Sequence, residues 1–310
     1  MMKPFSQQRG AAIIVALFVT SLVVIASIAM IIRLRIDLRN TELLINATQG
    51  KNLAEGSIAW AIEQLNQDWK QKKTNQIVDQ TPIISSTNTV DHATISSTIY
   101  DAQGRFNINN LTNPVFVDSF ATLITIINST IDPNTAHTLA LAVVDWISPG
   151  VKNAELEEYY LKLNPAYRAP HRPMISISEL RLVKGITPEL YALLEPIVIA
   201  LPDVTKININ NATAPVLMCL SKTLTLASAN AIIAKRNQTP FTSVQSFLAL
   251  DILKNNPITE NQITTISSYF LVKTSVKVEE QEILLYTLLQ RIEKNSHPYE
   301  VMLWQSKGTL

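Results

Sequence analysis

The chain has 310 residues, more than one typical domain, which allows an anchor and two or three compact units. Its formal net charge of +1 removes the strongest electrostatic argument for nucleic acid or an anionic surface as a partner. The seven glycines do not cluster, which argues against a phosphate-cradling loop or a dinucleotide fold. Cys219 is the single cysteine, so an internal disulfide and a thiolate zinc site are excluded. We expect it to be a small buried residue on a helix.

The most hydrophobic stretch lies near the N-terminus. Residues 11–32 carry no charged side chain and would span roughly 33 Å as a helix. A bilayer core is about 30 Å thick, so this stretch predicts a transmembrane helix. A secretory signal peptide would have a shorter apolar region that ends in a small-residue cleavage motif.

The helix is predicted to continue over residues 33–70. No proline occurs between Pro4 and Pro82, and apolar residues recur at helical spacing. The predicted stripe comprises Leu34, Leu38, Ile45, Leu53, Ile58, Ile62 and Leu65. A helix this long needs support from a globular body or from neighbouring subunits. Charge does not orient it in the membrane, because basic residues lie on both sides of the span.

The beginning of this helix resembles the N-terminus of a type IV pilin or pseudopilin precursor. A short basic leader ends in Gln8-Arg9-Gly10, and the hydrophobic helix begins at Ala11. In that family a prepilin peptidase of the inner membrane cuts after the glycine and methylates the new N-terminus. The resemblance implies cleavage between Gly10 and Ala11, a cytoplasmic leader and a periplasmic body.

The fifth residue after the implied cleavage site departs from the pilin pattern. Most members carry a glutamate there, whereas this chain has Val15. A carboxylate inside a bilayer is costly without a partner, which in these filaments is thought to be the terminal amine of the adjacent subunit. A subunit without the carboxylate has no such neighbour to satisfy, which implies a place at a filament tip. The alternative is an unrelated single-pass protein.

The body divides into a sheet and a helical region. Residues 71–90 are polar and predict a loop, and strands are predicted at residues 92–100, 269–278, 282–291 and 299–305. Residues 282–291 also have the composition of a helix. Helix starts are predicted at Asp132-Pro133, Ser178-Glu179, Thr187-Pro188 and Thr213-Ala214-Pro215. The predicted fold is α+β: a pilin-like long N-terminal helix packs on an antiparallel sheet that carries a large inserted α-helical domain.

Motifs in a fixed order resemble the minor pseudopilin K family of type II secretion over nearly the whole chain. They are Asp101-x-x-Gly104-x-x-Asn107-x-Asn109, Asp145-Trp146-Ile147, Ala154-Glu155 with Tyr159-Tyr160, Ser178-Glu179-Leu180-Arg181-x-Val183-x-Gly185 and Ile207-Asn208-Ile209-Asn210-Asn211-Ala212. The resemblance implies an insert of two SAM-like, helix-hairpin-helix-like units. It also implies a non-catalytic subunit at the tip of the pseudopilus, which supports protein export across the outer membrane. The implied partners are the minor pseudopilins I and J, the inner-membrane secretion platform and the prepilin peptidase.

These expectations divide the chain into seven segments. Residues 1–10 form the leader, 11–32 the transmembrane helix, 33–70 its periplasmic continuation, and 71–102 a loop with the first strands of the sheet. Residues 103–204 and 205–268 form the two helical units, and residues 269–310 supply the C-terminal strands.

Two polar patterns in the body have a structural and a ligand-binding interpretation. The asparagines at 107, 109, 208, 210 and 211 are expected to cap the helical units, because asparagine bonds to nearby backbone amides. Asp145, Glu155 and Glu158 are candidate calcium ligands by resemblance to the family's helical domain. The family tends to carry further acids where this chain has Ser148-Pro149-Gly150, so a solvated helix face stays open as the alternative. No other cofactor is expected.

The alternative function is a membrane-anchored DNA-binding or DNA-uptake protein, because residues 212–241 are similar to a helix-hairpin-helix unit. The corresponding hairpin at residues 221–225 has no glycine, and the chain has no basic surplus, so no nucleic-acid partner is predicted. An anchored periplasmic enzyme would need a clustered site. His92, His137, His171 and His297 are scattered, no serine has a nucleophile elbow, and no catalysis is predicted.

The implied cleavage site can be tested by replacing Gly10 with a bulky residue, Gly10→Leu. We expect the variant to keep its leader and the wild type to lose it, as measured by N-terminal sequencing of the membrane fraction. Normal trimming of the variant would refute cleavage between Gly10 and Ala11.

Overall fold

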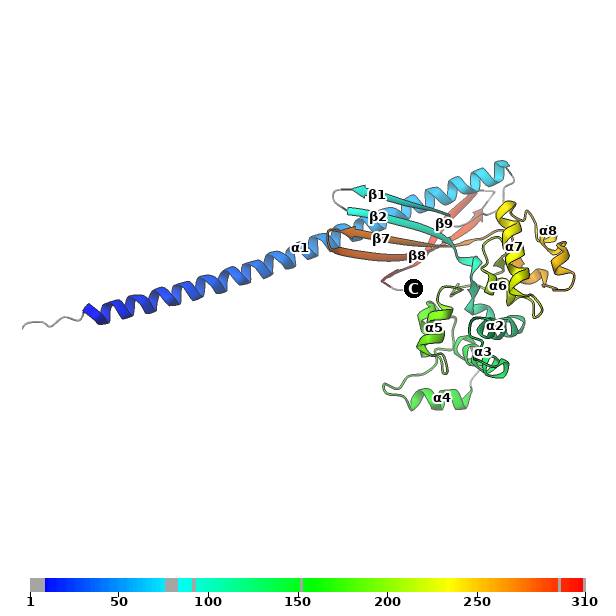
Figure 1. Ribbon diagram of the computed structural model, residues 1–310, viewed down its shortest axis with the longest axis horizontal. Coiled ribbons are helices and arrows are strands. Elements are labelled where there is room, and N and C mark those ends of the chain that lie inside the picture. The colour runs from blue at the N-terminus through cyan, green and yellow to red at the C-terminus, as the bar shows by residue number, and fades with distance from the viewer. Residues whose placement is uncertain (1–8, 76–82, 91–92, 151–152, 295–296, 309–310) are drawn as a thin grey trace, which may run out of the picture.

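The computed structural model describes residues 9–75, 83–90, 93–150, 153–294 and 297–308. Its dominant element is helix α1 (Arg9–Asn75), whose 67 residues extend over roughly 100 Å. Figure 1 shows the sheet packed on the C-terminal half of this helix, while the N-terminal half projects alone. A helical insert lies at the end of the sheet that is far from the free half of α1. The predicted combination of a long helix, an antiparallel sheet and a large insert is confirmed.

The sheet has the strand order β1-β2-β7-β8-β9, and every neighbouring pair is antiparallel. Its strands are β1 (Ile83–Val90), β2 (Ala93–Asp101), β7 (Tyr269–Val278), β8 (Gln281–Lys294) and β9 (His297–Lys307). Strands β2 and β7 pair directly, although the whole insert separates them in sequence. The insert therefore leaves and re-enters the sheet at adjacent positions.

One local expectation needs correction, and one predicted strand with an ambiguous composition is confirmed. The polar stretch at residues 71–90, predicted as a loop, instead continues α1 to Asn75 and later forms β1. Strand β1 is rich in Ser and Thr and gains its regular structure by pairing with β2, which a local reading of polarity cannot show. Residues 282–291, which also had a helical composition, lie within β8 because β7 and β9 pair on either side.

Helix α1 meets the sheet mainly through small residues. The residues buried in this contact follow a helical spacing and are Gly50, Ala54, Ser57, Ala61 and Leu65. A Cβ atom on Gly50 would clash with Cδ1 of Ile283, so the glycine lets α1 approach strand β8 closely. Of the predicted apolar stripe, Leu65 is buried against the sheet, Leu53, Ile58 and Ile62 are partly buried there, and Leu34, Leu38 and Ile45 are exposed.

Buried polar groups fix α1 on the sheet at two places. The Ser57 hydroxyl lies 2.7 Å from the Thr274 hydroxyl, near the middle of the contact. At the far end, Arg291 donates from Nε to Glu300 at 3.1 Å and from Nη2 to the carbonyl of Leu65 at 2.8 Å. The guanidinium also lies 4.6 Å from the ring centroid of Phe270. A buried cation is thus paired with a carboxylate and tied to the helix backbone.

The insert is built from short helices and two pairs of very short parallel strands. Its helices are α2 (Pro114–Ile127), α3 (Pro133–Ile147), α4 (Ala154–Leu161), α5 (Pro188–Leu194), α6 (Ala214–Met218), α7 (Leu226–Gln238) and α8 (Val244–Leu248). Strand β3 (Phe106–Asn107) pairs with β4 (Val198–Ile199), and β5 (Ile207–Asn208) pairs with β6 (Ile263–Thr264). Helices α3, α5 and α6 begin where Asp132, Thr187 and Thr213 were predicted to start them. The predicted start at Ser178 is a 3-10 helix that begins one residue earlier, at Ile177.

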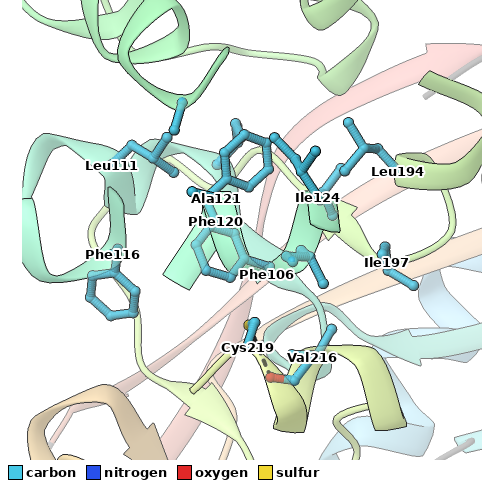
Figure 2. Close-up of a cluster of buried hydrophobic side chains, with 14 of the residues drawn as sticks. Phe106, Leu111, Phe116, Phe120, Ala121, Ile124, Leu194, Ile197, Val216 and Cys219 are labelled. Atoms are coloured by element: carbon cyan, nitrogen blue, oxygen red, sulfur yellow. Dashed lines mark hydrogen bonds between the residues drawn. The ribbon is translucent and has the colours of Figure 1, made fainter. Parts of the chain in front are cut away.

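One continuous hydrophobic core runs through the insert, from Phe106 to Ile263. At its centre the ring of Phe106 lies 6.0 Å from that of Phe116 and 5.6 Å from that of Phe120 (Figure 2). Cys219 follows α6 directly, is 3% exposed, and donates its thiol to the carbonyl of Val216. Burial raises the pKa of this thiol, so it packs as an unreactive apolar group, as predicted.

The anchoring of α1 on the sheet can be tested with Arg291→Leu. This change leaves Glu300, whose side chain is 0% exposed, without its cation, and should cost about 3 to 5 kcal/mol of unfolding free energy. Denaturant unfolding followed by circular dichroism measures the effect. The control is Arg39→Leu, which removes an exposed ion pair and should leave stability unchanged. Equal effects of the two changes would contradict the anchoring role.

Candidate functional site

The free half of α1 is the first functional surface. The helix segment from Ala12 to Lys70 is long and apolar enough to cross a membrane, and its most apolar window has a mean hydropathy of 2.8 and is 0% buried. Val15 is 61% exposed on this surface. Gly10 and Ala11 lie in the first turn of α1, while most of the leader, residues 1–8, is outside the described residues. The apolar surface therefore needs lipid or other helices to cover it.

The polar side chains of the free half are compatible with a bilayer. The hydroxyls of Thr20 and Ser21 both donate to the carbonyl of Leu17, and that of Ser27 donates to the carbonyl of Val23. Each hydroxyl thus finds an acceptor within its own helix, so burying it in lipid leaves no donor unmatched.

The second surface is the junction where the insert joins the sheet, and Asp101 is its centre. This carboxylate ends strand β2, is 7% exposed, and accepts four hydrogen bonds. The donors are the amide of Gln103, the side-chain amides of Asn208 and Asn211, and the hydroxyl of Ser267. Burial raises the pKa of Asp101, and the four hydrogen bonds oppose that rise. One carboxylate thus ties the outgoing chain to the second helical unit and to the returning chain.

Two neighbours of Asp101 complete the junction. The side chain of Gln103 donates to the carbonyl of Lys206 at 2.9 Å and accepts from the amide of Ser268 at 2.6 Å. A Cβ atom on Gly104 would lie 2.9 Å from the backbone oxygen of Asn211, so only glycine fits there. The sheet and the insert are therefore held by close backbone contact as well as by hydrogen bonds.

Two of the repeated asparagines, Asn109 and Asn210, bond to backbone groups far away in the sequence, whereas a helix cap bonds within a few residues. Asn109 exchanges two hydrogen bonds with the backbone of Met174, accepting at 2.9 Å and donating at 2.9 Å. Asn210 makes the same pair with the backbone of Phe241, at 2.9 and 3.0 Å. Each follows a short parallel strand in its own helical unit, so the two units share one construction. Local capping also occurs, because Asn107 accepts from the amide of Asn109.

The structure does not gather the candidate calcium ligands into one site. Asp145 is 3% exposed and accepts from the amide of Asn153, which fixes the loop before α4. Glu155 and Glu158 are exposed on α4, and Glu158 pairs with Lys162. Among the described residues, no three His, Cys, Asp or Glu side chains are placed to hold a metal ion. Calcium binding at Asp145, Glu155 and Glu158 stays a prediction from the resemblance.

Two of the three basic residues of the helix-hairpin-helix-like segment make contacts within the fold, and Lys235 is exposed. Lys222 in the hairpin pairs with Asp118 of α2 at 3.2 Å. Arg236 of α7 donates to the carbonyls of Ile209 and Ala212 at 2.7 and 2.6 Å, and burial lowers its pKa to about 10. Arg236 thus holds α7 on the backbone of its own unit, and Lys222 makes an exposed ion pair with the first unit, in keeping with the scaffold role expected for the segment.

From the sequence, Asp101 was predicted only to be part of a turn and of a family motif. A signal for its wider role was present, since the acid ends an apolar strand and asparagines follow in two matching segments. Which of those asparagines would reach the carboxylate could not be read from the sequence, because their contacts join residues more than a hundred positions apart.

The junction can be tested with Asp101→Asn. An amide has one acceptor oxygen and places its own donors against those of Asn208, Asn211 and Ser267, so we expect a loss of about 1 to 3 kcal/mol in unfolding free energy. Limited proteolysis should cut faster at the junction in the variant. The matched control is Asp251→Asn at an exposed position, which should change neither measurement. Unchanged proteolysis in Asp101→Asn would contradict the role of this carboxylate.

Comparisons with known proteins agree with this architecture. Models of the family described as type II secretion system (T2SS), protein K match residues 104–203 and 207–267. The type II secretion system protein K of Pectobacterium carotovorum is 29% identical, and the match covers 92% of this chain and 93% of that protein. The corresponding protein of Aeromonas hydrophila is 30% identical over 66% of this chain and 67% of its own length.

A solved structure shares the fold. A chain in the crystal structure of the GspK-GspI-GspJ complex from the enterotoxigenic Escherichia coli type 2 secretion system is similar with a TM-score of 0.68. It is 22% identical, and the match covers 90% of this chain and 100% of that chain. The family models match the two halves of the insert, and the full-length relatives add the helix and the sheet. This chain belongs to the type II secretion system protein K family.

Proposed function

We propose that this chain is the minor pseudopilin at the tip of the type II secretion pseudopilus. It would be a non-catalytic assembly subunit that supports protein export across the outer membrane. The proposal rests on one observation: the chain has an uncovered apolar helix at one end and a bulky insert at the other (Figure 1). The helix serves assembly in the membrane, and the insert lies where a further subunit would have to be added.

The free half of α1 supports an inner-membrane anchor with the body in the periplasm. Its apolar surface beyond the predicted span includes Leu34, Leu38, Leu44 and Ile45, all exposed. Apolar groups in this position are stabilised when helices of neighbouring subunits cover them. Counterparts of GspI and GspJ are the partners we propose, because the solved relative is part of a complex with those proteins.

Two features support a terminal place in the filament. Val15 offers no carboxylate to the terminal amine of another subunit, so nothing in the span favours a neighbour above it. The insert is joined rigidly at Asp101 and Gly104, so its bulk stays beside the end of α1. Cleavage between Gly10 and Ala11 by prepilin peptidase would expose the new N-terminus of this anchor.

Co-purification tests the proposed assembly. The full-length chain, extracted in mild detergent, should form a complex with minor pseudopilins I and J of the same secretion system. Replacing Leu44 and Ile45 by Asn should weaken the complex about tenfold or more, because both side chains are exposed apolar groups on α1. The control, Lys51→Asn on the same helix, should leave the affinity of the complex unchanged. A wild-type chain that binds neither partner would contradict the proposed place at the tip of the pseudopilus.

A further inference from the structure

Arg105 is the exception among the partly or fully buried arginines of the described chain. Three such arginines occur outside the exposed class: Arg105, Arg236 and Arg291. Arg236 donates to two backbone carbonyls, and Arg291 pairs with Glu300 and donates to the carbonyl of Leu65. For Arg105, no hydrogen bond or ion pair of the guanidinium occurs among the described residues. Glu195 acts on it only at a distance.

The side chain of Arg105 is partly buried, and solvent still reaches its guanidinium. Burial lowers the pKa of Arg105, which means that the surroundings disfavour its charge. The nearest compensation is the ring of Tyr100, whose centroid lies 6.0 Å from Cζ, at the outer limit of a cation–π contact. The described part of the fold therefore supplies no ion pair for this charge, while its nitrogens stay open to solvent and to a partner.

Arg105 lies where the insert meets the open face of the sheet. Alternate residues of each strand face α1, so the next residues face away from it. On that second face Lys273 pairs across strands with Tyr286, and its ammonium lies 5.9 Å from the ring centroid of Tyr286. Thr98, two residues before Tyr100 on the same face of β2, pairs across strands with Lys273. Tyr100, Arg105, Lys273 and Tyr286 thus form one basic and aromatic surface, which we call the Arg105 patch.

The shape of the patch fits a protein surface better than a small molecule. The hollow beside Arg105, lined by Ile175, Ser176 and Trp304 among others, has a volume of about 10 Å³, room for one water or one carboxylate oxygen. Arginine and tyrosine are the side chains that most often dominate protein–protein binding energy. No carboxylate pairs with Lys273 in the described part of the chain either. The positive charge of the patch is therefore complementary to an acidic partner.

We infer that Arg105 binds a carboxylate of a partner pseudopilin, whose acidic segment docks on the Arg105 patch. This inference rests on the proposed function, which supplies the partner. It assigns a second contact surface, on the opposite side of the sheet from α1. The partner carboxylate would complete the pairing that Arg291 already has inside the fold, with a bidentate fork that lysine cannot reproduce.

The test uses the full-length chain in detergent and the minor pseudopilin complex of the same secretion system. Arg105→Met keeps the aliphatic stem and removes the charge, so affinity should fall about tenfold or more. Arg105→Lys should give an intermediate loss. The matched control is Arg181→Met, which removes an exposed arginine that also lies over a tyrosine ring, at 5.6 Å from Tyr191, and should not change affinity.

Stability and salt dependence separate docking from a structural role. The melting temperature of free Arg105→Met should equal or exceed that of the wild type, because an unpaired, partly buried cation is removed. Wild-type binding should weaken with salt more steeply than binding of the variant. Unchanged affinity in Arg105→Met, or an equal loss in Arg181→Met, would overturn the inference while leaving the proposed function intact. Absence of wild-type binding would overturn both.

If Arg105→Met folds poorly, a charge-reversal experiment tests the same contact. Arg105→Glu should abolish binding, and lysine substitutions of the partner's acidic residues, made one at a time, should restore it at a single position. Failure of every such substitution to restore binding would count against a direct carboxylate contact.

Discussion

The buried carboxylate of Asp101 is the constraint on which the arrangement of the molecule depends. The insert is attached to the sheet by two chain segments that leave from neighbouring strands, so it could swing about that edge as about a hinge. Asp101 prevents this because it accepts from the outgoing chain, from the start of the second helical unit and from the returning chain. Gly104 adds a close backbone contact with Asn211 that no side chain would permit. The insert therefore keeps a fixed place at the far end of α1.

Many polar groups inside the body have partners, although Nε of Arg236, Nη1 of Arg291 and Oε2 of Glu300 are buried without one among the described residues. Asn109 and Asn210 each bind a distant backbone segment of their own helical unit in the same way, and one hydrophobic core runs through both units. Arg291 and Arg236 are likewise paired or bonded to carbonyls. The exposed apolar face of α1 and the guanidinium of Arg105 lack such partners within the described chain. Unsatisfied groups of this kind are a cost to the isolated subunit that assembly with other proteins can offset.

Helix α1 shows how one element serves two environments. Its C-terminal half meets the sheet through Gly50, Ala54 and Ala61, whose small side chains let the backbone approach closely. Its N-terminal half carries large apolar side chains and internally bonded hydroxyls, which suit lipid. The same helix is continuous through both environments.

The sequence by itself determined the elements whose signals are local. Twenty-two uncharged residues from Ala11 onward predicted the anchor. Proline in the first turn located α3, α5 and α6, and alternation located β7. The order of short motifs indicated the family. Helix propensity and hydropathy act over a few residues, so they could be read without knowledge of the fold.

Only the tertiary structure decided what depends on contacts between distant residues. It placed Ile83–Val90 in the sheet, turned the small residues of α1 together with Leu65 toward that sheet, and brought Asn208 to Asp101. It also left Arg105 without a carboxylate partner among the described residues. Burial and pairing are properties of the folded chain, because a side chain's neighbours are set by packing and not by its position in the sequence.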